Sequence, residues 1–171
     1  MARREPADLA LQPKQEQLGR LIEATGKDVA TWLGYGGALG GGKSAAIRRL
    51  MLGRRAQYPG TNGAIVRRVY DDVKKNHIDP FLREYPELIP YYRGNPHYEL
   101  SFPEWGGSKI SFMYAETTAE VERKFPGQEF FYIYIEQPEQ FSERELRTIK
   151  TRNRWPGAKQ GKCKTALFFI R

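Results

Sequence analysis

The residues of this chain with the clearest chemical potential form a short glycine-rich segment, 37–44, which reads Gly-Ala-Leu-Gly-Gly-Gly-Lys-Ser. This is the G-x-x-x-x-G-K-S spacing of a phosphate-binding loop. Glycines allow successive backbone N–H groups to turn inward around phosphate oxygens. They stand at Gly37, Gly40, Gly41 and Gly42. Lys43 would then reach the β- and γ-phosphates of a nucleotide, and Ser44 would hold Mg²⁺.

The segments on either side of this loop have the patterns that such a motif requires. An apolar run at Val29–Tyr35 predicts a buried strand before the loop, and Ala45–Tyr58 predicts a helix after it. The helix N-terminus would add partial positive charge at the point where phosphate binds. The alternative is a glycine-rich turn that merely precedes Lys-Ser, and the flanking strand and helix weigh against it.

A second group of candidate residues follows a later apolar run, Phe130–Ile135, which predicts a fully buried strand. Glu136 comes next, and a carboxylate there is costly unless it serves a cation or a hydrogen-bond network. We interpret it as the acid on the metal side of the site, the alternative being a side chain turned to solvent. Gln137 follows, and it can orient a water molecule but cannot accept its proton. The pair therefore predicts nucleotide binding with slow or absent turnover.

The other predicted elements position these two groups. Strands that alternate with helices predict an α/β P-loop NTPase fold, with a mainly parallel sheet, helices on both faces and a small β-hairpin. Ser142 and Glu145 have the spacing of a capping box at a helix start. The remaining expected elements are a helix over 9–24, a strand over 64–66, a helix over 71–85 interrupted near Pro80, a loop over 86–96, hairpin strands over 98–102 and 109–114, and a strand over 165–170.

Composition limits the possible function classes. The chain has 171 residues, of which 40% are hydrophobic and 28% charged, as expected for one soluble globular domain. No run approaches the ~20 apolar residues of a membrane span. Cys163, His77 and His97 are too few and too scattered for a metal site, so we interpret both histidines as ordinary surface or turn residues.

The net charge of +8 favours a polyanionic partner. From Arg144 to the last residue the basic side chains greatly outnumber the single acid, Glu145. Such a stretch would hold a phosphate backbone without distinguishing its sequence. A solvated face followed by a basic tail explains the same pattern equally well, and both interpretations stay open.

Three stretches together resemble the ATPase domain of the large terminase subunit of tailed bacteriophages. They are the phosphate-binding loop at 36–44, the strand with its Arg-Arg step at 64–70, and the segment at 124–143 that surrounds the second candidate strand. The third stretch is the most specific, because phosphate-binding loops occur in many NTPases. The resemblance covers roughly residues 30 to 155.

The resemblance implies roles for particular residues. Lys43 and Ser44 match the phosphate and magnesium residues of the family, in its Walker A motif. Glu136 matches the first acid of the Walker B pair, and Gln137 matches the second, catalytic one. Gln15, within 12–15, resembles the family's adenine-binding glutamine. By this division residues 1–28 form an N-terminal helical segment with an adenine contact, and residues 29–171 form the P-loop ATPase core.

Two departures from the family pattern affect the expected activity. Leu39 stands where many members have an arginine. An arginine finger would then come from Arg67, Arg68 or Arg123, or from a neighbouring subunit. Gln137 replaces the catalytic carboxylate, and the sequence does not distinguish a natural glutamine from an engineered one.

The function implied by the resemblance is a hydrolase that uses ATP and Mg²⁺ as a molecular motor for viral DNA packaging. Its expected partners are double-stranded DNA, a portal ring, a small terminase subunit and sister copies in a homo-oligomeric ring, in the host cytoplasm and without a membrane. The family's nuclease domain would follow residue 171, so we expect no nuclease activity from these residues. Two alternatives are a nucleotide-binding module without useful catalysis and another P-loop enzyme, such as a helicase or a small-molecule kinase.

Overall fold

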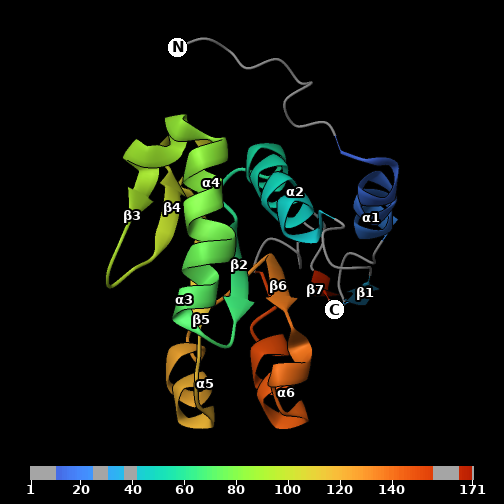
Figure 1. The fold of residues 1–171 in the computed structure, drawn as a ribbon, viewed down its shortest axis with the longest axis vertical. Coiled ribbons are helices and arrows are strands. Elements are labelled where there is room, and N and C mark those ends of the chain that lie inside the picture. The colour runs from blue at the N-terminus through green and yellow to red at the C-terminus, as the bar shows by residue number, and fades with distance from the viewer. Residues whose placement is uncertain (1–10, 25–30, 37–41, 156–165, 171) are drawn as a thin grey trace.

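One sheet organises the chain in the computed structural model, which describes residues 11–24, 31–36, 42–155 and 166–170 (Figure 1). The described part of the sheet has seven strands, and the first five in spatial order run parallel. The last two strands run antiparallel to their neighbours and extend the sheet, and the predicted hairpin is the pair formed by the fifth and sixth strands. In spatial order the strands are β1 (Thr31–Tyr35), β7 (Ala166–Ile170), β6 (Tyr132–Glu136), β2 (Asn62–Arg67), β5 (Ser108–Tyr114), β4 (Glu99–Phe102) and β3 (Tyr92–Arg93).

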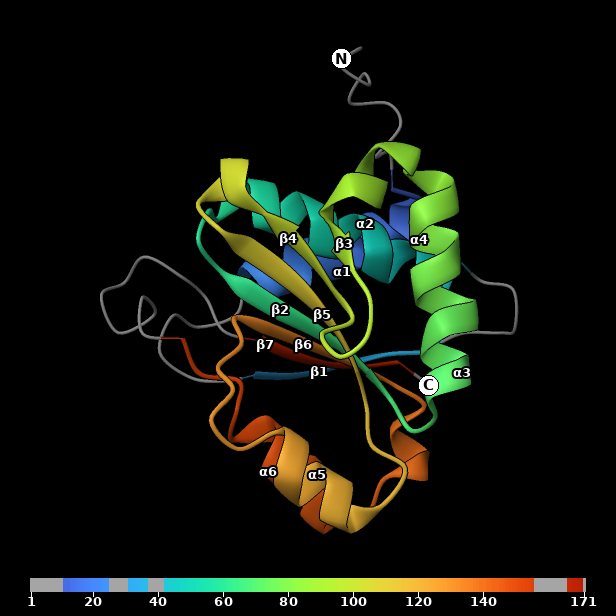
Figure 2. The same cartoon turned by 90° about the vertical axis from the view of Figure 1, so that its left-hand side faces the viewer.

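Helices cover both faces of this sheet, as the alternating pattern predicts (Figure 2). One face carries α1 (Pro13–Ala24), α2 (Lys43–Gln57) and a column formed by α3 (Tyr70–Val73), the π-helical segment η2 (Lys74–Ile78) and α4 (Asp79–Glu84). The other face carries α5 (Thr118–Lys124) and α6 (Glu143–Lys150). Short 3₁₀ turns lie at Pro86–Tyr91, Pro103–Trp105 and Pro138–Gln140. The predicted fold class is therefore confirmed.

The central strand β6 shows why the sheet needs two covered faces. Tyr132 and Tyr134 belong to the apolar cluster beneath α1, α2 and α4, whereas Ile133 and Ile135 belong to the cluster beneath α5 and α6. All four side chains are fully buried. Successive strand residues point to opposite faces, so an unbroken apolar run fits only a strand that is covered on both sides.

The helix predicted over 71–85 differs from expectation at its centre. It is not interrupted at Pro80, because that proline occupies the first turn of α4, where a missing N–H is tolerated. A π-helical turn, η2, comes immediately before it. Pro80 cannot donate to the carbonyl of Asn76, four residues earlier, and that oxygen accepts a hydrogen bond from Arg48 Nη1 at 2.9 Å instead.

The segment predicted as a loop over 86–96 also differs, since it contains a 3₁₀ turn and strand β3. With only two residues, this strand is too short to leave an alternating pattern in the sequence. The capping box at the start of α6 is confirmed, because Ser142 Oγ accepts from the backbone N–H of Glu145 and the Glu145 carboxylate accepts from the N–H of Ser142.

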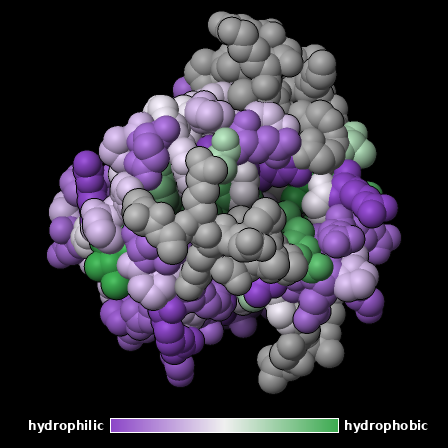
Figure 3. All heavy atoms as spheres, turned by 90° about the horizontal axis from the view of Figure 1, so that it is seen from above, coloured by the Kyte–Doolittle hydropathy of each residue, from purple (hydrophilic) through white to green (hydrophobic). Residues whose placement is uncertain are grey.

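The surface seen from above is mostly hydrophilic, with small and separate apolar areas (Figure 3). Large apolar side chains that are exposed in the described ranges are few and lie apart: Leu21, Trp32, Val69 and Ile89. Isolated exposed apolar residues of this kind are normal for a protein surface. None of the described helices is long and apolar enough to cross a membrane.

Candidate functional site

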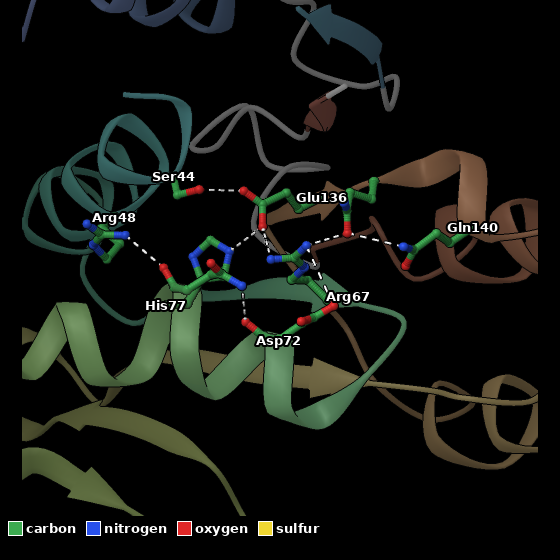
Figure 4. A network of polar contacts seen from close by, with 9 residues as sticks. Ser44, Arg48, Arg67, Asp72, His77, Glu136 and Gln140 are labelled. Atoms are coloured by element: carbon green, nitrogen blue, oxygen red, sulfur yellow. Dashed lines mark hydrogen bonds and ion pairs between the residues drawn. The ribbon is translucent and has the colours of Figure 1, made fainter. Parts of the chain in front are cut away.

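The site predicted from the sequence lies where the carboxyl ends of β2 and β6 meet the start of α2. The two strands are paired in parallel, with Val66 opposite Ile135, so Arg67 and Glu136 end their strands side by side. Ser44 lies in the first turn of α2, opposite this strand end (Figure 4). In open α/β sheets ligands bind at the carboxyl ends of parallel strands, and this is that edge of the sheet.

Glu136 is the centre of the site and is 7% exposed. Its Oε1 accepts a hydrogen bond from Ser44 Oγ at 2.5 Å. Its Oε2 lies 2.8 Å from Arg67 Nη1 and 3.0 Å from His77 Nε2. Glu136 is therefore not turned to solvent, and its burial is offset by a hydrogen-bond network. Its role as the acid on the metal side remains a proposal.

The charge state of Glu136 follows from these contacts. Burial by itself raises the pKa of the carboxyl group, but the bonds from His77 and Ser44 and the charge of Arg67 outweigh it and lower the pKa to about 2. The group is therefore an anion at neutral pH. An anion held by donors from two helical segments and a strand can serve a cation without having to be deprotonated first.

The phosphate-binding loop is only partly within the described residues. Gly37, Leu39, Gly40 and Gly41 lie outside them, whereas Gly42 is described and Lys43 begins α2. Gly42 has a φ of 68°, and a Cβ there would come within 3.0 Å of Gln15 Nε2. The left-handed backbone favours glycine at this position, and a Cβ there would also displace the amide of Gln15.

Gln15 connects α1 to the end of the phosphate-binding loop. It is 2% exposed, and its Nε2 donates to the carbonyl oxygen of Gly42 at 3.1 Å. Its Oε1 accepts from the backbone N–H of Gln12 at 3.0 Å. The structure thus brings Gln15 beside the loop. Its role as an adenine contact remains a proposal.

Gln137 has an unusual backbone conformation for a residue with a side chain. Its φ is 56° and its ψ is 57°, and it precedes Pro138. The side-chain Oε1 accepts hydrogen bonds from Arg67 Nη2 and, at 3.2 Å, from Gln140 Nε2. A left-handed non-glycine residue costs on the order of 1–3 kcal/mol and is characteristic of functional sites.

Arg67 connects Glu136, the last residue of β6, with Gln137, which follows it. One end of its guanidinium group pairs with Glu136 through Nη1, and the other end binds Gln137 and lies 3.8 Å from Asp72 through Nη2. The side chain is 7% exposed, and its Nε makes no hydrogen bond within the described part of the chain. Arg67 is therefore already part of the site.

The other two arginines considered as fingers are engaged elsewhere. Arg68 pairs with Glu145 of α6 at 2.8 Å and lies over the ring of Phe141. Arg123 is exposed on α5 and lies 3.6 Å from Glu120.

His77 corrects an expectation from the sequence. It is fully buried rather than a surface or turn residue, and it contacts the carboxylate of Glu136. Burial lowers its pKa, and the charges of Arg48 and Arg67 lower it further against the opposing effect of Glu136. One signal was present in the sequence, since Val73, His77 and Phe81 recur every four residues on one helix face. A histidine in an otherwise apolar stripe indicates a buried polar partner.

The donors at this edge suit Mg²⁺ in the way nucleotide enzymes hold it. Ser44 Oγ and Glu136 Oε1 are hard oxygen donors in direct contact at a helix start. No cluster of three or more His, Cys, Asp or Glu side chains that could hold a metal occurs in the described ranges. Mg²⁺ is commonly bound by one or two protein oxygens together with substrate phosphates, so the residues present fit this ion.

Comparisons with known proteins identify the fold. No family profile and no curated protein sequence matches the chain. Among solved structures, the large terminase of bacteriophage HK97 aligns with a TM-score of 0.65 and 13% identity over 94% of this chain and 33% of its own. The large terminase of a thermophilic bacteriophage, in complex with ADP, gives a TM-score of 0.63 and 15% identity, over 94% of this chain and 38% of its own.

A third structure consists of one domain alone. The large terminase ATPase domain of Thermus phage P74-26 aligns with a TM-score of 0.54 and 15% identity, over 94% of this chain and 64% of that domain. The chain spans about a third of the length of the HK97 terminase and not much more of the ADP-bound one. By its fold, this chain is therefore similar to bacteriophage large terminases, in the part of them that the P74-26 structure defines as the ATPase domain.

Proposed function

We propose that this chain is the ATP-binding and ATP-hydrolysing domain of a viral DNA-packaging motor, a terminase large subunit. The observation that carries the proposal is the contact between Ser44 Oγ and Glu136 Oε1 at 2.5 Å. It joins the residue after the Gly-Lys of the phosphate-binding pattern to the acid that ends β6. The two halves of a nucleotide site, far apart in the sequence, thus meet at the sheet edge where ligands bind. The terminase fold, and the ADP complex of the thermophilic phage terminase, support the same function.

Each residue at this edge has a distinct proposed role. The backbone N–H groups at the start of α2 would bind the phosphates of ATP, with Lys43 adding a positive charge. Ser44 and Glu136 would hold Mg²⁺, which supplies charge neutralisation at the β- and γ-phosphates. Arg67 fixes the second oxygen of Glu136 and the amide of Gln137. Gln15 keeps the end of the loop against α1 and would contact the adenine ring from there.

ATP binding is the direct test of this proposal. We expect the chain to bind ATP more tightly with Mg²⁺ than with EDTA, and we expect Lys43→Ala to lose most of that affinity in isothermal titration calorimetry. Lys75→Ala is the matched control, because it removes an exposed lysine from the same face and should bind as the unaltered chain does. Equal affinities for the unaltered chain and Lys43→Ala would show that the phosphate-binding loop does not hold ATP.

Gln137 favours a second candidate function, a nucleotide-binding module with impaired catalysis. A glutamine amide cannot act as a general base, and its Oε1 already accepts hydrogen bonds from Arg67 and Gln140. We expect Gln137→Glu to retain ATP binding and to raise ATP turnover by about 10²-fold, the lower range for a general base. A similar low rate in both forms would place the limitation in assembly or in a missing arginine finger.

Double-stranded DNA is the proposed macromolecular partner, together with a portal ring, a small terminase subunit and sister subunits. The basic residues of α6 and the turn after it support a polyanion: Arg144, Arg147 and Arg152 line an open hollow of about 550 Å³ with Thr148 and Thr151. Arg144 and Arg147 also form ion pairs with exposed glutamates, and these pairs reduce the positive electrostatic potential at the surface. Binding of duplex DNA that weakens steeply between about 50 and 200 mM salt would support this partner.

A further inference from the structure

The proposed function gives no role to His77, a fully buried polar side chain in contact with Glu136. His77 is 0% exposed and reaches the nucleotide site from a helix that contributes nothing else to Glu136 among the described residues. Its backbone belongs to the π-helical segment η2, and π-helical turns inside helices are frequent at functional sites. Figure 4 shows the imidazole reaching from this helix to the carboxylate at the end of β6.

The helix that carries His77 is fixed to the helix of the phosphate-binding loop. Arg48 of α2 donates through Nη1 to the carbonyl of Asn76, four residues before Pro80, which has no N–H to donate. The same guanidinium group pairs with Glu84 through Nε at 3.1 Å and through Nη2. These contacts lie on both sides of His77 along the column. The position of the imidazole relative to α2 is therefore determined by a buried arginine, which is 5% exposed.

The chemistry of the contact defines the tautomer of His77. The carboxylate oxygen Oε2 of Glu136 can only accept, so Nε2 of the imidazole must carry the proton. Nδ1 makes no hydrogen bond within the described part of the chain, which suits a lone pair better than a second N–H. The imidazole therefore donates one hydrogen bond, to Oε2 of Glu136.

The two oxygens of Glu136 have different partners as a result. Oε2 receives both His77 and Arg67, while Oε1 receives only Ser44 among the described residues. Two donors from different elements prevent the carboxylate from rotating. Arg67 alone would hold it less firmly, because its guanidinium group is shared with Gln137 and Asp72.

We propose that His77 is a positioning residue of the nucleotide site, which donates Nε2–H to Oε2 of Glu136 and thereby keeps Oε1 directed at Ser44 and the metal position. This inference rests on the proposed function, since it assigns a part in Mg²⁺–ATP binding. Residues that orient a metal ligand in this manner typically change metal affinity by about 10- to 100-fold when they are replaced. His77 is not itself a ligand of nucleotide or metal in this arrangement, so its effect passes through Glu136.

The test compares ATP affinity with Mg²⁺ and with EDTA in three forms of the full chain. His77→Phe keeps a ring but removes the donor, and His77→Gln keeps an N–H at a similar reach. We expect His77→Phe to reduce the Mg²⁺-dependent gain in ATP affinity by about 10-fold, with metal-free ATP binding unchanged, and His77→Gln to restore most of it. An equal Mg²⁺-dependent gain in the unaltered chain and folded His77→Phe would overturn the inference.

A measurement on the unaltered chain keeps the inference testable if His77→Phe does not fold. The chain has two histidines, so ¹⁵N spectra of the imidazoles can be assigned with His97→Gln, which alters the exposed one. We expect the Nε2–H tautomer for His77 and a shift of its resonances when Mg²⁺ is added to the ATP-bound chain. An Nδ1–H tautomer, or no shift, would refute the positioning role. Absence of any ATP binding by the unaltered chain would instead refute the proposed function.

Discussion

Glu145 is the buried carboxylate that joins α5, α6 and the end of β2, and replacing it with glutamine gives a quantitative prediction. Its Oε1 accepts from Arg68 Nη1 at 2.8 Å and from Thr118 Oγ1 at 2.9 Å. Its Oε2 accepts from the backbone N–H of Ser142 at 2.7 Å and from Ser142 Oγ at 3.0 Å. Glu145→Gln removes the charge and nearly keeps the shape.

The expected loss follows from the pKa of Glu145. Burial raises the pKa of this carboxyl group, but the bonds from Arg68, Ser142 and Thr118 outweigh it and lower the pKa from 4.5 to about 2. At about 1.36 kcal/mol per pH unit, this difference corresponds to about 3 kcal/mol in favour of the ionised form in the folded state. The carboxylate lies just below the surface, so solvent screening reduces the value, and we expect Glu145→Gln to lose about 2 kcal/mol at pH 7.

The pH dependence has a defined sign. A carboxylate with a lowered pKa contributes stability above the unfolded value near 4.5, and this contribution disappears as the pH falls toward about 2. Urea unfolding of both forms at pH 7 and pH 3 measures it, and we expect the difference between them to fall below about 1 kcal/mol at pH 3. The control is Glu143→Gln, whose exposed pair with Arg147 in the same helix should contribute less than about 0.5 kcal/mol. An equal loss at both pH values would refute the electrostatic reasoning.

Three further changes test other parts of the structure. Ser142→Ala removes the side-chain cap of α6 and should lower the free energy of unfolding by about 1 kcal/mol in urea titrations, whereas an unchanged midpoint would show that the cap is dispensable. Gly63→Ala would place a methyl group 2.7 Å from Met51 Cε and against Arg55 Nη1, so we expect a loss of about 1–3 kcal/mol and a lower melting temperature; a rise would contradict the packing argument. Gln15→Ala removes the side-chain donor to the carbonyl of Gly42, which keeps only the N–H of Ala46, and should weaken ATP binding by about 10-fold in calorimetry; unchanged affinity would remove Gln15 from the site.

Local patterns in the sequence predicted a large part of the fold. The apolar run of β6 indicated burial on both faces, and the spacing of Ser142 and Glu145 indicated the start of α6. The position of Glu136 at the end of the apolar run indicated that it would not be turned to solvent, and it meets Ser44 at the sheet edge. These features depend on residues close together in the chain or on the general geometry of parallel strands.

Contacts between distant segments could not be predicted in the same way. The column that carries His77 is fixed by Arg48 of α2, which donates to the carbonyl of Asn76, four residues before Pro80. The sequence around Pro80 and around Arg48 contains no pattern that indicates this contact. The contacts of Arg67 with both Glu136 and Gln137 likewise depend on the register of β2 against β6. Sequence patterns predict helices and strands, whereas the partners of buried polar groups are determined by how those helices and strands pack.

The strand order has a consequence for how these residues fold during synthesis. Within the described sheet, β1 pairs only with β7, although the other five strands lie between the two in the sequence. The strand that leads into the phosphate-binding loop is made early by the ribosome, but its hydrogen-bonding partner emerges after all the other described strands. Contacts between such distant segments are slow to form and leave strand edges exposed in the meantime. Strand β1 therefore joins the sheet only after nearly all of these residues have been synthesised, so we expect a nascent chain to lack the complete sheet edge of the proposed nucleotide site until then.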